Sequence, residues 1–340
     1  MNKLLKPIAF VAIMLPLAFA LACGGDDEPD DPTGGNGGSN QPSKPAWDIT
    51  SFVLPLADPY IYVDHNEKKY YIYGTNADNG IKCYSSDDLE HWRSEGLALN
   101  MKDSYGSKWF WAPEVYYVEK LKKYVMTYSA EERVCFAFGD SPKGPFVMDP
   151  KTPMMPNEGN IDSSIFWDED GKPYLYFVRW SVQSQGNTIY VAELNDDYKS
   201  INMETIKECV HADYNTWETV MPRVTEGPSV FKHDGKYYLL YSANGYTSPD
   251  YAVGYATADK PTGPWTKYSG NPVLRRYGAL VGCGHGAPFI DLDGKWHYVF
   301  HAHKSTTEVH PRNSFIVDMF FKDGGVVALE GKLINPMIVK

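Results

Sequence analysis

Short stretches of alternating apolar and polar residues, rich in tyrosine and phenylalanine, recur along the chain after about residue 47. Five of them follow a turn signal, and they cover residues 67–73, 121–126, 170–176, 234–239 and 293–298. Three of these turns contain Asp-Gly, a strong β-hairpin signal when alternating residues flank it. One lysine per turn recurs at Lys69, Lys123, Lys172, Lys236 and Lys295, with spacings of 54, 49, 64 and 59 residues. The pattern predicts five copies of one hairpin unit.

Each predicted hairpin is extended by a further short strand. The strand before the turn is expected at residues 59–63, 113–118, 163–167, 228–231 and 288–290, and a third strand at 81–85, 134–138, 188–192, 252–257 and 315–320. Repeated units of three to four antiparallel strands form a β-propeller, whereas a β-sandwich would lack this recurring unit. We therefore predict an all-β fold, a five-bladed β-propeller over residues 47–340, with the first strand of each unit nearest the axis.

Composition and charge narrow the classes of function that the chain can have. The chain of 340 residues is 43% hydrophobic and 14% aromatic, with 29 Gly and 24 Pro, which suits short strands and tight turns. Its formal net charge of −11 disfavours a nucleic-acid partner, because an acidic surface repels phosphates. The sequence contains no nucleophile elbow, P-loop, HExxH or dinucleotide fingerprint.

The first 46 residues differ from the rest. Residues 1–22 carry Lys3 and Lys6 near their start and continue with an apolar stretch, which predicts an export signal peptide. Cys23 follows directly and resembles the lipidated cysteine of a bacterial lipoprotein, although Ala20 stands where leucine is usual; ordinary signal cleavage is the alternative. Residues 23–46 are acidic and rich in glycine, which predicts a flexible tether. An acidic run after such a cysteine resembles a surface-export signal of some Gram-negative gut bacteria, so we expect an outer-membrane lipid anchor, on the periplasmic face or the cell surface.

Four further cysteines are Cys83, Cys135, Cys209 and Cys283. An exported chain permits disulfides, but none of these residues forms a CxxC pair, so a zinc site has little support. Buried free thiols are the favoured interpretation.

Acidic residues recur at the start of the predicted inner strands. With Pro59, Pro113, Ser163, Pro228 and Pro288 taken as equivalent, three units carry an acid one or two positions earlier: Asp58, Asp162 and Glu226. Buried carboxylates are costly unless they are paired, so three in one funnel indicate chemistry rather than stability. Glu114 is expected to point to the opposite face from its neighbour and to take no part.

The segments around these acids resemble glycoside hydrolase family 43 over about residues 48–330. They are Ala57-Asp58-Pro59-Tyr60-Ile61, Trp111-Ala112-Pro113-Glu114, Ile161-Asp162-Ser163-Ser164-Ile165-Phe166, Thr225-Glu226-Gly227-Pro228-Ser229-Val230 and Gly282-Cys283-Gly284-His285-Gly286-Ala287-Pro288. The resemblance implies a five-bladed propeller and an inverting O-glycosyl hydrolase of the α-L-arabinofuranosidase or β-xylosidase type. It implies Asp58 as general base, Glu226 as general acid, and Asp162 as the group that raises the pKa of the acid and orients it.

The resemblance also implies further site residues. His285 is similar to a histidine that contacts a hydrated calcium or other ion on the axis; a neutral, hydrogen-bonded histidine is the alternative. Such an ion would be structural, since the chemistry requires no cofactor. Trp111 and Trp109 are candidate sugar platforms, although a tryptophan is often core. Arg312 is a candidate for holding Asp162 or a sugar hydroxyl, and a surface arginine is the alternative.

The function expected from these residues is hydrolysis of plant-type glycans by a monomer that releases α-L-arabinofuranosyl or β-D-xylosyl units. The alternatives are a propeller glycosidase with another sugar specificity and a surface glycan-binding lipoprotein without activity. Retention of Asp58, Asp162 and Glu226 argues against a pure binder. The sequence leaves the sugar, the linkage and exo or endo action open.

Lipidation of Cys23 gives a first testable prediction. The Cys23→Ser variant loses the acceptor thiol, so the protein should move from the membrane fraction to the soluble fraction. Detergent partitioning of the variant and the parent chain measures this change, and equal partitioning would count against the anchor.

Overall fold

The computed structural model describes residues 47–340 except residues 181–185 and 221. The predicted signal peptide, Cys23 and the tether lie outside the described residues. Within the described part of the chain, no helix has the length and apolar character needed to cross a membrane.

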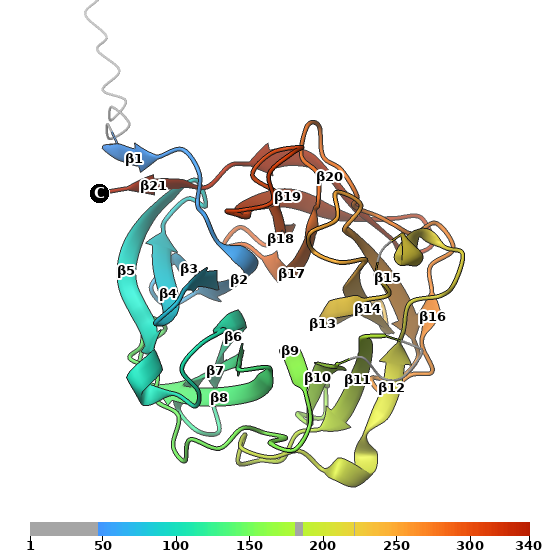
Figure 1. The fold of residues 1–340 in the computed structure, drawn as a ribbon, viewed down its shortest axis with the longest axis horizontal. Helices are drawn as coiled ribbons and strands as arrows, with labels where there is room; N and C mark the ends of the chain where they lie inside the picture. Colours follow the sequence, from blue (N-terminus) through green and yellow to red (C-terminus); the bar gives the residue numbers. More distant parts are fainter. Residues whose placement is uncertain (1–46, 181–185, 221) are drawn as a thin grey trace, which may run out of the picture. The chain divides into compact units, whose positions relative to one another are not determined.

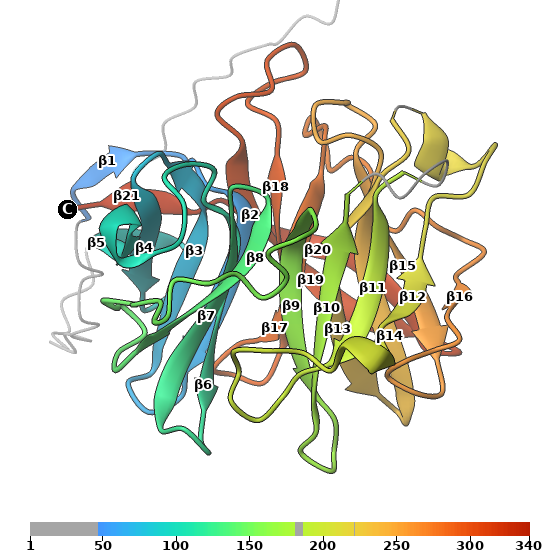
Figure 2. The same ribbon diagram turned by 60° about the horizontal axis from the view of Figure 1, so that its bottom comes forward.

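Five sheets surround a central axis, as predicted (Figure 1, Figure 2), and their strands pair antiparallel except for one parallel pair in the first blade. The innermost strands are β2 (Ala57–Asp64), β6 (Trp111–Val118), β9 (Asn160–Trp167), β13 (Thr225–His233) and β17 (Gly284–Ile290). The second strands are β3 (Lys69–Ala77), β7 (Lys123–Ala130), β10 (Pro173–Arg179), β14 (Lys236–Ala243) and β18 (Trp296–Ala302). The third strands are β4 (Gly80–Ser86), β8 (Arg133–Gly139), β11 (Thr188–Glu193), β15 (Ala252–Ala258) and β19 (Asn313–Lys322). Four blades have an outer strand, namely β5 (His91–Asn100), β12 (Lys207–Val210), β16 (Thr266–Lys267) and β20 (Val326–Ile334).

The two ends of the described chain meet in the first blade. Strand β21 (Met337–Val339) pairs in parallel with β5, and β1 (Ile49–Ser51) pairs antiparallel with β21 (Figure 1). The sequence pattern did not predict this closure, because two strands of three residues carry no periodicity of their own. Short 3₁₀ turns, η1 (Met101–Asp103), η3 (Met203–Thr205) and η4 (Trp217–Thr219), lie between strands.

Apolar side chains fill the space between neighbouring sheets. One cluster joins the first two blades through Tyr71, Tyr73, Val115 and Met126, all of them fully buried. Burying such aromatic and aliphatic side chains is the main favourable term in folding. All four cysteines of the propeller are free thiols, with Cys83, Cys135 and Cys283 buried and Cys209 half-buried.

Every inner strand contains a bulge near its start, where one extra residue interrupts the pairing, so that two residues lie opposite one residue of the second strand. The first bulge residue has a positive φ in all five blades: Asp58 (50°), Ala112 (43°), Asp162 (53°), Gly227 (57°) and His285 (41°). A left-handed residue re-aims the side chains of a strand locally. The position of the bulge in the last blade shows that the predicted alignment of the repeats was wrong there. Gly286, not Pro288, is the residue equivalent to Pro59.

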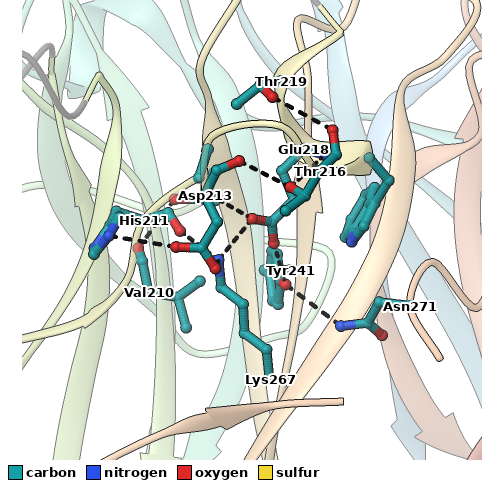
Figure 3. A network of polar contacts seen from close by, with 12 residues as sticks. Val210, His211, Asp213, Thr216, Glu218, Thr219, Tyr241, Lys267 and Asn271 are labelled. Atoms are coloured by element: carbon teal, nitrogen blue, oxygen red, sulfur yellow. Dashed lines mark hydrogen bonds and ion pairs between the residues drawn. The ribbon is translucent and has the colours of Figure 1, made fainter. Parts of the chain in front are cut away.

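A buried ion pair fixes the segment that leads into β13 (Figure 3). The Glu218 side chain is only 1% exposed, and its Oε2 accepts hydrogen bonds from Lys267 Nζ (2.6 Å) and the Asp213 amide (2.7 Å). Its Oε1 accepts from the Tyr241 hydroxyl (2.5 Å). Lys267 also donates to the His211 carbonyl (2.6 Å), so β16 of the fourth blade is tied to the loop after β12 of the third.

Removing the lysine should therefore destabilise the propeller. Lys267→Met leaves the Glu218 carboxylate buried without its counter-ion, and we expect the free energy of unfolding to fall by about 3 kcal/mol. Chemical denaturation measures this loss. The control is Lys340→Met, whose partner Asp48 is exposed; there the change should stay below about 1 kcal/mol. Equal losses in the two variants would contradict the assignment.

Candidate active site

A cavity of about 770 Å³ opens at the end of the propeller where the inner strands begin. All five blades line it, and so do all seven of the site residues predicted from the sequence: Asp58, Trp109, Trp111, Asp162, Glu226, His285 and Arg312. The residues come from segments up to 254 positions apart, so only the circular arrangement of the blades brings them together.

Asp58 is held as a carboxylate. Its Oδ1 accepts from Arg312 Nη1 (2.8 Å) and lies 3.4 Å from His285 Nδ1 and 3.2 Å from His301 Nδ1. Its Oδ2 accepts from the Thr75 hydroxyl (2.7 Å). Burial by itself would raise the pKa of Asp58, but Arg312 and the two histidines outweigh burial and hold that pKa well below its usual range.

Glu226 is shifted in the opposite direction. Burial raises its pKa to about 7, and the Asp58 carboxylate adds to the increase. A hydrogen bond from the Tyr251 hydroxyl to Oε1 (2.7 Å) and the charge of Arg312 oppose the shift without cancelling it. A large part of the Glu226 population therefore keeps its proton near neutral pH.

Asp162 stands close to both of the other acids. Its amide donates to Ser129 Oγ (3.1 Å), and its Oδ2 accepts from the Gly227 amide (3.3 Å), next to Glu226 in the chain. Burial, then repulsion by Glu226 and Asp58, raises the pKa of Asp162 well above its usual value. Because repulsion acts on both partners, Asp162 and Glu226 titrate as a pair.

His285 lies between the acids, with Nδ1 3.4 Å from Asp58 Oδ1 and 3.8 Å from Asp162 Oδ2. Burial lowers the pKa of His285, so the ring is neutral at physiological pH. Among the described residues, no group of three or more His, Cys, Asp or Glu side chains is gathered as a direct metal site requires. An ion at His285 would have to be held through water, and the axial calcium stays a prediction.

Arg312 contacts a different acid from the one predicted. Its guanidinium reaches Asp58, through Nη1 (2.8 Å) and Nη2 (3.5 Å), rather than Asp162. It also lies 4.4 Å above the ring of Tyr246. The reason is that the bulge turns Asp58 toward the loop between the second and third strands of the last blade, which carries Arg312.

The two predicted tryptophans form one wall of the cavity. The rings of Trp109 and Trp111 stack at 5.7 Å, and Trp109 is 44% exposed. Phe110 between them is buried in the core. Flat exposed rings of this kind can pack against the apolar face of a sugar.

Glu114, which was expected to point to the opposite face from its neighbour and to take no part, lies near the axis of the propeller. It lines a narrow axial cavity of about 10 Å³ below the three acids and accepts a hydrogen bond from Tyr116. The bulge at Ala112 breaks the alternation and turns Glu114 inward. Burial raises the pKa of Glu114 to about 8. It is absent from the lining of the large cavity, as expected.

Sequence reasoning missed several residues around the acids. Tyr251, Thr75 and His301 contact Glu226 or Asp58, and Trp180 and Tyr246 line the cavity. A usable signal existed, because the second strand of a hairpin ends beside the start of the first. Thr75, Trp180, Tyr246 and His301 all lie at or just after the end of a second strand.

Comparison with known proteins agrees with this geometry. A chain described as endo-1,4-β-xylanase from Bacteroides thetaiotaomicron is 50% identical, with a TM-score of 0.81 over 86% of this chain and 100% of that chain. Xylosidase/arabinosidase 43A of Humicola insolens is 28% identical over 79% of this chain and 92% of its own length. A β-D-galactofuranosidase of Aspergillus niger is 28% identical over 76% of this chain and 78% of its own length.

The family assignment rests on a match to a whole family rather than to a single relative. Residues 52–327 match the family described as glycosyl hydrolases family 43. The match spans all five blades and includes the three acids at the floor of the cavity. The chain therefore belongs to glycosyl hydrolase family 43.

Proposed function

We propose that this protein hydrolyses glycosidic bonds of plant glycans with inversion, releasing an α-L-arabinofuranosyl or β-D-xylosyl unit. In this proposal Asp58 is the general base that activates water. Glu226 is the general acid that protonates the leaving oxygen. Asp162 keeps Glu226 protonated and orients it.

One observation carries the proposal: within one cavity the pKa of Asp58 is shifted down while the pKa of Glu226 is shifted up. Arg312 keeps Asp58 ionised, which a base requires, while burial raises the pKa of Glu226 to about 7, which an acid requires. Pairs of titratable groups separated in this way identify the acid and the base of an active site. An inverting hydrolase also needs room for a water between them, and carboxyl groups about 6.5–9.5 Å apart provide it.

The contacts of Asp162 support its proposed role, which is to keep Glu226 protonated and to orient it. Its negative charge, when present, disfavours a second charge on Glu226, and the hydrogen bond from the Gly227 amide fixes its distance from the acid. Asp162 also borders the narrow axial cavity, whereas Glu226 lines only the large one. Glu226 is therefore better placed to meet a substrate.

The choice of sugar is supported by the relatives and by the cavity walls. The names of the relatives include xylosidase, arabinosidase and galactofuranosidase. Trp109 and Trp111 offer stacking surfaces on one side. Arg312 also lines the cavity, where a guanidinium can hold a sugar hydroxyl.

Export and anchoring are also part of the proposal. The apolar start of residues 1–22, Cys23 and the acidic tether support attachment to the outer membrane, where the enzyme would meet large glycans. We propose that it works there as a monomer and requires no cofactor for the chemistry.

The assigned roles predict a contrast between two variants. Asp58→Asn removes water activation, so activity should be lost on all substrates. Glu226→Gln removes protonation of the leaving oxygen, so its defect should be about 10²–10⁴-fold on oligosaccharides and much smaller on dinitrophenyl glycosides. Steady-state kinetics on arabinofuranosides, xylosides and galactofuranosides measures both effects.

The stereochemistry tests the same proposal independently. The first-formed sugar should carry the opposite anomeric configuration to the substrate, which NMR detects before mutarotation. The exposed-acid control, Asp87→Asn, should keep full activity. Net retention, or equal Glu226→Gln defects on both substrate types, would overturn the roles.

A further inference from the structure

Tyr251 makes a specific contact with the proposed acid. It follows the loop after β14 and is fully buried, and its hydroxyl donates to Glu226 Oε1 at 2.7 Å. Burial and the neighbouring carboxyl groups raise the pKa of Tyr251 well above its usual value, so the phenol stays protonated and remains a donor. The contact occupies one oxygen of Glu226 and leaves Oε2 to carry the proton.

The same tyrosine ring touches the residue that holds the proposed base. The rings of Tyr251 and His301 stack at 5.6 Å with an interplanar angle of 13°. His301 is fully buried, and its Nδ1 accepts a hydrogen bond from the Asp58 amide at 3.1 Å and lies 3.2 Å from Asp58 Oδ1. Burial and Arg312 lower the pKa of His301 to about 3, so this ring is neutral.

The ring pair has little freedom to move. A Cβ at Gly284 would come within 2.3 Å of Tyr251 Cε1, so the tyrosine lies directly against the inner strand β17. On the other side, the Asn244 amide donates to the carbonyls of Asp250 and Trp217, both at 2.9 Å. These contacts hold the backbone next to Tyr251 at a fixed position relative to the segment before β13.

We propose that Tyr251 and His301 form one positioning unit for the two acids. Tyr251 fixes the Glu226 carboxyl group, His301 fixes the backbone that carries the Asp58 carboxylate, and the stacked rings set the separation of the two acids. The inference rests on the proposed function, because it assigns Glu226 as the acid and Asp58 as the base.

The hydrogen bond from Tyr251 also contributes to the proton transfer. When Oε2 of Glu226 gives its proton to the leaving oxygen, the bond from that oxygen to the anomeric carbon breaks and a carboxylate remains on Glu226. Water forms the new bond to the anomeric carbon and gives a proton to Asp58. Tyr251 donates to the Glu226 carboxylate and stabilises it. The other titratable or charged groups that face Glu226 are Asp58, Asp162 and Arg312. The Tyr251 hydroxyl is neutral and donates directly to Glu226.

The test compares Tyr251→Phe with the parent enzyme. The ring and its stacking remain while the hydroxyl is lost, so the Glu226 carboxylate is less stable and its pKa rises. A hydrogen bond to a charged group corresponds to about a 10- to 100-fold change in an equilibrium constant, so the basic limb of the kcat/KM profile should move up by about 1–2 pH units. The fall in kcat should be larger on oligosaccharides than on dinitrophenyl glycosides.

His301→Phe tests the other half of the unit. It keeps an aromatic ring under Tyr251 but removes the polar contact with Asp58, so kcat should fall equally on both substrate types. The basic limb should stay where it is. This contrast separates the positioning roles from a general loss of stability. A general loss of stability would lower activity without shifting the basic limb and without changing how kcat depends on the leaving group.

The matched control is Tyr128→Phe, which alters a fully buried tyrosine whose hydroxyl is hydrogen-bonded to Ser104 rather than to an acid. It should leave the pH profile unchanged. An unmoved basic limb in Tyr251→Phe, or equal losses on both substrate types, would overturn the inference even where Glu226→Gln behaves as proposed. If Glu226→Gln itself shows no dependence on the leaving group, the proposed function fails instead.

Discussion

A left-handed residue at the bulge of each inner strand is the constraint on which the site depends. It interrupts the alternation of the strand and turns the side chains of Asp58, Asp162 and His285 toward the same floor. In the fourth blade Gly227 takes the left-handed position, and Glu226 stands one residue earlier. An asparagine, aspartate or histidine tolerates this conformation better than most residues, but the backbone still costs free energy there. The surrounding sheets supply that free energy through their packing.

Electrostatics follows from this geometry. Three carboxyl groups on one floor repel each other, and a single guanidinium lies among them. Because Arg312 binds Asp58 directly, Asp58 is held ionised. Burial raises the pKa of the other two acids, Asp162 and Glu226. Asymmetric placement of one positive charge is thus enough to divide similar side chains into a base and a protonated acid.

The second strands contribute as much to the site as the inner strands. Thr75, Trp180 and His301 stand at or beside the ends of β3, β10 and β18, and Tyr246 and Tyr251 belong to the loop after β14. Hairpin geometry places each of these segments beside a bulge. The floor therefore comes from the inner strands, while the contacts that position the acids come mostly from their neighbours.

The sequence by itself determined the blade count, the strand positions within a few residues and the three acids. These features repeat, and a repeated pattern is visible without coordinates. It did not determine the register of the last blade, the inward turn of Glu114 or the partner of Arg312, because a bulge of two residues leaves no mark in the alternation of apolar positions. It also missed β1 and β21, whose pairing joins opposite ends of the chain, and the Tyr251–His301 contact, whose residues are 50 positions apart. Only the tertiary structure decides such contacts, since they depend on the closure of the circle and not on local propensity.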